Sequence, residues 1–135
     1  APWSLSNLVL PHLKAHKNGS IINIASVEAL TPGFGLGIYS TSKAAILMLS
    51  KNQAKEWGKH GIRVNAICPG LIKTKFSAAL WQNEKILGKI QKTLPSERMG
   101  MPEEMVGLAC LLASDAGGYM TGGVYTADGG YMIAG

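Results

Sequence analysis

The chain has 135 residues, a length typical of one domain, and 47% of them are hydrophobic, which suits a folded core. Its formal charge of +5 comes mainly from dispersed lysines such as Lys51, Lys55 and Lys59, whose spacing is typical of a solvated helical face; with no aromatic platform beside them, we expect no nucleic-acid partner. No apolar run approaches the roughly 20 residues of a membrane-spanning helix, so we expect no membrane partner either.

Hydrophobic periodicity and turn residues predict alternating strands and helices along the chain. The expected elements are a helix over 3–17 with Pro11 inside it, a strand over 20–26, a helix over 38–59, a strand over 62–68, a helical lid over 76–92, a helix over 102–114 and a strand over 123–127. This alternation favours an α/β fold with a parallel sheet. The glycines at 33, 35 and 37 lack the spacing of a phosphate-binding loop, so we interpret them as a flexible connection.

Tyr39 and Lys43 stand four residues apart near the start of the predicted helix 38–59. Side chains at this spacing share one helical face, with Cβ atoms roughly 5–6 Å apart. A phenol ordinarily has a pKa of about 10, and a neighbouring ammonium lowers that pKa, which makes the phenol a usable acid or base. Ser26, at the end of the predicted strand 20–26, supplies a hydroxyl for the same substrate oxygen. A tyrosine and lysine at this spacing also occur by chance on amphipathic helices, and that reading stays open on these residues alone.

The predicted strand 62–68 is followed by Pro69-Gly70-Leu71-Ile72-Lys73-Thr74. With Ser26 and the Tyr39–Lys43 pair, this segment resembles the short-chain dehydrogenase/reductase family, which carries a serine, a YxxxK and a PGxIxT segment in this order and at these distances. The resemblance extends from the first residues to Asp128-Gly129-Gly130. It implies an α/β fold that corresponds to the second half of a doubly wound parallel sheet of the Rossmann type.

The resemblance also implies an activity and residue roles. The expected reaction is hydride transfer between the nicotinamide of NAD or NADP and the carbon of a secondary alcohol or ketone. Ser26 would orient the substrate oxygen, Tyr39 would pass the proton, and Lys43 would lower the tyrosine pKa and bind the nicotinamide ribose. Tyr39, Lys43, Pro69, Gly70, Ile72 and Thr74 would contact the cofactor.

The lid segment suggests the substrate and the remaining partners. Its apolar residues follow the PGxIxT turn directly, and Phe76, Leu80 and Trp81 are the ones that we expect to meet a small-molecule carbonyl or alcohol; each also suits simple core packing. The resemblance implies a homo-oligomer. Cys68 and Cys110 show no pairing motif, so we expect no metal and no disulfide, with reduced thiols in the cytoplasm.

The phosphate-binding glycine loop of the family is not found in the chain. We therefore interpret residues 1–135 as the C-terminal catalytic half of a single Rossmann-type domain whose N-terminal cofactor half lies upstream, with strand 20–26 next to it. The chain begins at Ala1 without an initiator methionine, which fits part of a longer protein. Two alternatives remain: a catalytically silent, truncated paralogue acting as an interaction or oligomerisation module, and a Schiff-base lyase with Lys43 as nucleophile and Tyr39 as proton relay.

Overall fold

The computed structural model describes residues 1–134. Its centre is a three-stranded parallel sheet in the order β1-β2-β3, formed by β1 (Gly19–Ile24), β2 (Ile62–Pro69) and β3 (Val124–Ala127). Ile21 pairs with Val64 in the first ladder and Ala66 pairs with Val124 in the second. The predicted α/β class and the parallel sheet are confirmed.

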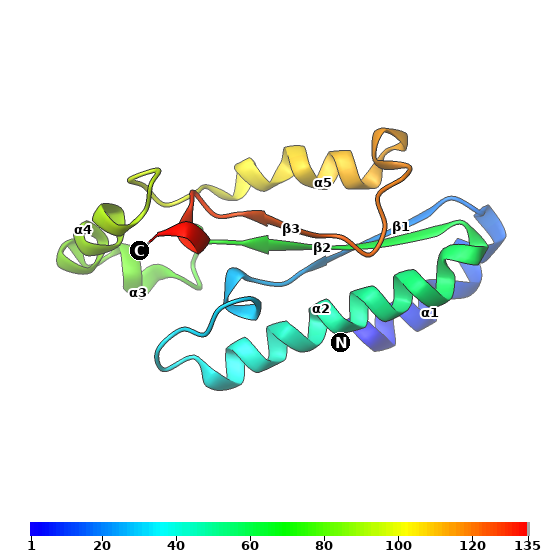
Figure 1. Ribbon diagram of the computed structural model, residues 1–135, viewed down its shortest axis with the longest axis horizontal. Coiled ribbons are helices and arrows are strands. Elements are labelled where there is room, and N and C mark those ends of the chain that lie inside the picture. The colour runs from blue at the N-terminus through cyan, green and yellow to red at the C-terminus, as the bar shows by residue number, and fades with distance from the viewer. Residues whose placement is uncertain (135) are drawn as a thin grey trace.

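Helices cover both faces of this sheet (Figure 1). The helices α1 (Pro2–His16) and α2 (Gly37–Trp57) lie on one face and α5 (Val106–Ala113) lies on the other. Alternate residues of β1 point to opposite faces, since Asn23 donates to Ser50 Oγ of α2 while Ser20 donates to the Leu112 carbonyl of α5. The short helices α3 (Ala78–Trp81) and α4 (Glu84–Thr93) lie beyond the carboxyl ends of the strands.

The core lies between the sheet and the helices α1 and α2. Every second residue of β2 faces these helices, and the alternation produces two buried clusters that share that strand. One cluster contains Ile62, Val64, Ala54 and Trp57, with Leu10, Leu13 and Ile21 packed against it. The other contains Ala25, Leu47, Ala66 and Cys68, and it lies directly beneath the ends of β1 and β2.

The predicted elements differ most from the structure in three places. The lid predicted over 76–92 breaks into α3 and α4 because the Asn83 side chain accepts hydrogen bonds from Lys85 N and Ile86 N, which starts a new helix. The helix predicted over 102–114 opens with a 3₁₀ turn, η3 (Pro102–Met105). The strand predicted over 20–26 ends at Ile24, so Ser26 instead precedes a 3₁₀ turn, η1 (Val27–Ala29).

Three further expectations can be compared with the described residues. Within 1–134, no helix is both long and apolar enough to cross a bilayer. Both cysteines are free, with Cys68 buried in β2 and Cys110 exposed on α5. Lys51, Lys55 and Lys59 are all exposed, as their spacing predicted.

Candidate active site

The carboxyl ends of the three strands meet at one edge of the sheet. Ser26 follows β1, Pro69 ends β2 and Asp128 follows β3. Ala25 N still donates to Ile67 O at 2.8 Å, so Ser26 stays beside β2 after the strand itself has ended. The first turns of α2 lie at this same end of the sheet (Figure 1). Ligands of open parallel sheets bind at this edge.

Lys43 links α2 to the end of β1. Its Nζ donates to the Ile24 carbonyl at 3.1 Å, two residues before Ser26. The same Nζ lies 5.7 Å from the centroid of the Tyr39 ring, because four residues on a helix bring both side chains to one face. The positive charge therefore lies between the tyrosine and the strand end that carries the serine.

The Ser26 side chain is buried, and its hydroxyl oxygen acts as a hydrogen-bond acceptor. Its Oγ accepts from Glu28 N at 3.2 Å, which leaves the hydroxyl hydrogen free to donate to another oxygen. The neighbouring Cys68 is fully buried. Burial raises the pKa of the Cys68 thiol, more than the Ser26 backbone and the Lys43 charge lower it, so the thiol is protonated and unreactive at neutral pH.

The turn after β2 is held tightly on both sides. Gly70 N donates to Ala127 O, and a Cβ at Gly70 would lie 2.6 Å from Asp128 Cα, so only glycine fits this approach. Lys73 N donates to Gly100 O and Gly100 N to Leu71 O, both at 2.9 Å. The intervening residue, Ile72, is half-buried, and its N–H donates no hydrogen bond within residues 1–134.

The predicted lid residues lie in different surroundings. Phe76 is 87% exposed and stacks on Tyr39, with ring centroids 6.1 Å apart and an interplanar angle of 26°. Trp81 Nε1 donates to Thr74 O at 2.9 Å, and Lys73 Nζ lies 5.0 Å from the indole centroid. The indole therefore closes the turn at Thr74, whereas Leu80 is half-buried on α3.

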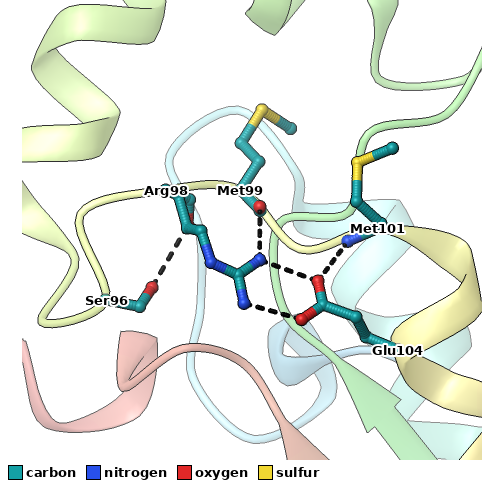
Figure 2. A network of polar contacts seen from close by, with 5 residues as sticks. All are labelled: Ser96, Arg98, Met99, Met101 and Glu104. Atoms are coloured by element: carbon teal, nitrogen blue, oxygen red, sulfur yellow. Dashed lines mark hydrogen bonds and ion pairs between the residues drawn. The ribbon is translucent and has the colours of Figure 1, made fainter.

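An ion pair beside the turn after β2 was not predicted from the sequence (Figure 2). Arg98 donates to both carboxylate oxygens of Glu104, at 2.6 and 2.7 Å, and Met101 N donates to Glu104 Oε2 at 2.8 Å. The Arg98 hydrogen bonds, and then the Met101 N–H, lower the pKa of Glu104 to about 2. The network encloses Gly100, so it steadies the residue that pairs with Leu71 and Lys73.

Glu28 is a second residue that the sequence analysis missed. Its carboxylate accepts from Tyr131 Oη at 3.2 Å and from Ser40 Oγ at 3.4 Å. The partners stand 103 and 12 residues away, so no local spacing signals these contacts. The only sequence signal is the position of a carboxylate two residues after Ser26.

Comparison with known proteins identifies a family over nearly the whole chain. The family model described as enoyl-(acyl carrier protein) reductase matches residues 1–132. The chain is 40% identical over 126 residues to dehydrogenase/reductase SDR family member 4 of Oryctolagus cuniculus, covering 93% of this chain and 48% of that protein. It spans about half the length of the curated relatives that it matches.

Two solved structures are similar over the same extent. A putative NAD(P)-dependent gluconate 5-dehydrogenase from Beutenbergia cavernae with bound NADP is 37% identical, with a TM-score of 0.93, and the match covers 98% of this chain and 53% of that one. A 4-hydroxyisoleucine dehydrogenase complexed with NADH is 33% identical, with a TM-score of 0.94, and the match covers 99% of this chain and 56% of that one.

Proposed function

The chain belongs to the short-chain dehydrogenase/reductase family, and from that membership we propose that it carries the catalytic residues of an NAD(P)-dependent oxidoreductase. The proposed reaction transfers a hydride between the nicotinamide and the carbon of a secondary alcohol or ketone. One observation carries the proposal: the Lys43 ammonium bonds the Ile24 carbonyl, two residues before Ser26, and lies 5.7 Å from the Tyr39 ring centroid.

The residues around the β2 turn fit a nicotinamide cofactor. The N–H of half-buried Ile72, which donates no hydrogen bond within residues 1–134, is a donor suited to the carboxamide oxygen. The ammonium of Lys43 and the hydroxyl of Tyr39 suit ribose hydroxyls, and Pro69, Gly70 and Thr74 would complete the turn around the ring. When bound, NAD(P) supplies or accepts the hydride. The NADP and NADH of the two similar structures support either dinucleotide for this chain.

The proton transfer is proposed to depend on residues of this chain. During reduction the Tyr39 hydroxyl donates its proton to the substrate oxygen as negative charge develops there, and during oxidation it takes the proton back. Because Ser26 Oγ already accepts from Glu28 N, its hydrogen is free to donate to that same oxygen, where it would stabilise the developing charge. Lys43 stabilises the negative charge that remains on the Tyr39 oxygen once the proton has left.

The substrate is proposed to be a small carbonyl compound or alcohol with an apolar portion. Phe76 supports this choice because its exposed ring stacks on Tyr39, where it would contact a substrate held by the phenol. Leu80 and Trp81 would form the wall behind it. Assembly into a homo-oligomer and a cytoplasmic location are also part of the proposal.

We propose that this chain is the C-terminal half of a longer protein, because its relatives are about twice as long. The experiment uses that full-length protein. NADH and NADPH oxidation is followed with a panel of ketones, and cofactor binding is measured by fluorescence. We expect Tyr39→Phe to lower kcat by about 10²–10⁴-fold while the cofactor Kd stays near that of the unmodified protein, because only the proton donor is removed. Lys43→Ala should lose both activity and affinity.

Tyr119→Phe is the matched control, since Tyr119 is fully exposed on the loop after α5. Its kcat should equal that of the unmodified protein. A Tyr39→Phe enzyme that keeps more than about a tenth of kcat would exclude Tyr39 as the proton donor.

A further inference from the structure

Glu28 lies between the two elements that carry Ser26 and Tyr39. It occupies the middle of η1, and its backbone N–H donates to Ser26 Oγ at 3.2 Å. Its side chain extends toward α2, where Oε2 accepts from Ser40 Oγ at 3.4 Å. Ser40 is the residue directly after Tyr39. Glu28 therefore contacts Ser26 through its backbone N–H and Ser40 through its carboxylate.

The other carboxylate oxygen is held from the C-terminal end of the described chain. Tyr131 opens the 3₁₀ turn η5 (Tyr131–Ile133) and donates to Glu28 Oε1 at 3.2 Å. The η5 turn is itself fixed, because the Asp128 carboxylate accepts from Gly130 N and Met132 N, both at 3.0 Å. Burial and the Glu28 carboxylate raise the pKa of the Tyr131 phenol, so this hydroxyl stays protonated and donates at neutral pH.

The loop between η1 and α2 adds little to the alignment of Ser26 and Tyr39. After η1 the chain passes through a loop in which Gly35 has a φ of 77° and Phe34 is fully exposed. Apolar packing brings η1 to α2, since Ala29 and Ile46 both pack against the cluster that contains Leu47. The Glu28 contacts add directional hydrogen bonds to this packing. Hydrogen bonds to a carboxylate are stronger than those between neutral groups, so the Glu28 contacts are suited to set that alignment.

We propose that Glu28 is a positioning residue, which holds the η1 turn against the first turn of α2 so that the Ser26 and Tyr39 hydroxyls meet one substrate oxygen. The inference rests on the proposed function, because it assigns Glu28 a task in that same site. Glu28 acts through Ser26 and Ser40 and takes no part in the proton transfer. Tyr131 fixes the carboxylate from the opposite side.

Gly33 provides a way to move this carboxylate without removing it. A Cβ at Gly33 would collide with Glu28 Oε2, which is the far end of a flexible side chain. Gly33 has no positive φ, so Gly33→Ala introduces no backbone strain there. The substitution should therefore displace the carboxylate from Ser40 and leave the fold intact.

The test measures kcat, KM and the NADPH Kd of the full-length enzyme with the ketone that it reduces fastest. We expect Glu28→Gln and Gly33→Ala each to lower kcat by about 10–100-fold, the effect of a small misplacement of reacting groups, with the NADPH Kd changed less than twofold. In a Glu28→Ala background, Gly33→Ala should have no further effect, because the carboxylate that it displaces is gone. Tyr131→Phe should reproduce part of the loss.

Glu103→Gln is the matched control, since Glu103 is an exposed carboxylate on η3, and it should leave kcat unchanged. A full-length enzyme that reduces no ketone with either dinucleotide contradicts the proposed function itself. An active enzyme whose Glu28→Gln variant keeps kcat within twofold overturns only the positioning role. An equal loss from Gly33→Ala with and without Glu28, or a loss that appears as weaker NADPH binding, overturns it as well. If Glu28→Gln does not fold, Gly33→Ala alone tests the positioning role. A kcat within twofold of the unmodified enzyme, or a loss that appears as weaker NADPH binding, would then overturn that role.

Discussion

Gln53 is a polar residue in an apolar position of α2. It is 1% exposed on the face that packs against the sheet, next to Ala54 of the core. Ser50, one turn earlier on the same face, receives a hydrogen bond from Asn23, but both side-chain amide atoms of Gln53 lack a partner in the described part of the chain. A buried polar group without a partner costs about 1–3 kcal/mol of stability.

We predict that Gln53→Leu stabilises the protein. Leucine removes the two unpaired amide atoms and keeps most of the side-chain volume, so the free energy of unfolding should rise by about 1–3 kcal/mol. Urea denaturation of the full-length protein measures the change. Gln82→Leu, at an exposed position, is the control and should stay within about 0.5 kcal/mol. A less stable Gln53→Leu variant would mean that the amide finds partners in the complete protein.

At the scale of single residues, contacts between residues close in sequence can be predicted from their spacing. The spacing of Tyr39 and Lys43 is enough to bring both side chains to one helical face, and the structure shows Lys43 Nζ near the Tyr39 ring. The link between Glu28 and Tyr131 is different because it spans 103 residues and depends on where β3 delivers the end of the chain. Such a contact follows from the tertiary fold and from no local pattern.

The Arg98–Glu104 pair acts on the elements around it. It joins the segment before η3 to η3 itself and so holds Gly100 in its pairing with Leu71 and Lys73 (Figure 2). Surface ion pairs usually contribute little, but this one is bidentate and also accepts the Met101 N–H. We therefore expect its effect on stability to be visible through its pH dependence.

The pH dependence has a definite sign. In the folded protein the pKa of Glu104 is about 2, below its ordinary 4.5, so between these values the unfolded chain binds more protons than the folded chain. The contribution of Glu104 is complete above pH 4.5 and is lost as the pH falls toward 2. We predict that Glu104→Gln lowers the Tm at neutral pH and that the difference from the unmodified protein shrinks through this window. Thermal melts over the pH range test it, with Glu103→Gln showing no such trend; a difference independent of pH would contradict it.

The elements themselves were predicted to within a few residues, because periodicity and turn residues are local signals. The predicted strand 62–68 appears as Ile62–Pro69 and the predicted helix 38–59 as Gly37–Trp57. The prediction of the lid as one helix was wrong. The helical spacing of apolar residues continues across the break between α3 and α4, so it does not reveal that break. Only the side-chain hydrogen bonds of Asn83 mark the second start.

At the scale of the whole molecule, the sheet has an open edge at β1. Ala25 N donates to Ile67 O, so the alternation of a parallel strand turns the Ile21 and Asn23 amides toward β2 and those of Ile22 and Ile24 away from it. Ile24 is 53% exposed at this edge. A cavity of about 450 Å³ runs along this strand between it and α1. An unpaired edge of this kind is a template for another strand.

We predict that amide hydrogen exchange alternates along β1 in the isolated 135-residue chain. The Ile21 and Asn23 amides should be protected by β2, whereas Ile22 and Ile24 should exchange rapidly because their donors face solvent. In the full-length protein, whose relatives are about twice as long, a preceding strand should protect all four. The paired amides serve as the internal control, and protection of Ile22 and Ile24 that grows with concentration would show a second copy filling the edge. Uniform protection in a dilute monomer would instead mean that the edge is satisfied within the chain, and the expected place of the upstream half beside β1 would be wrong.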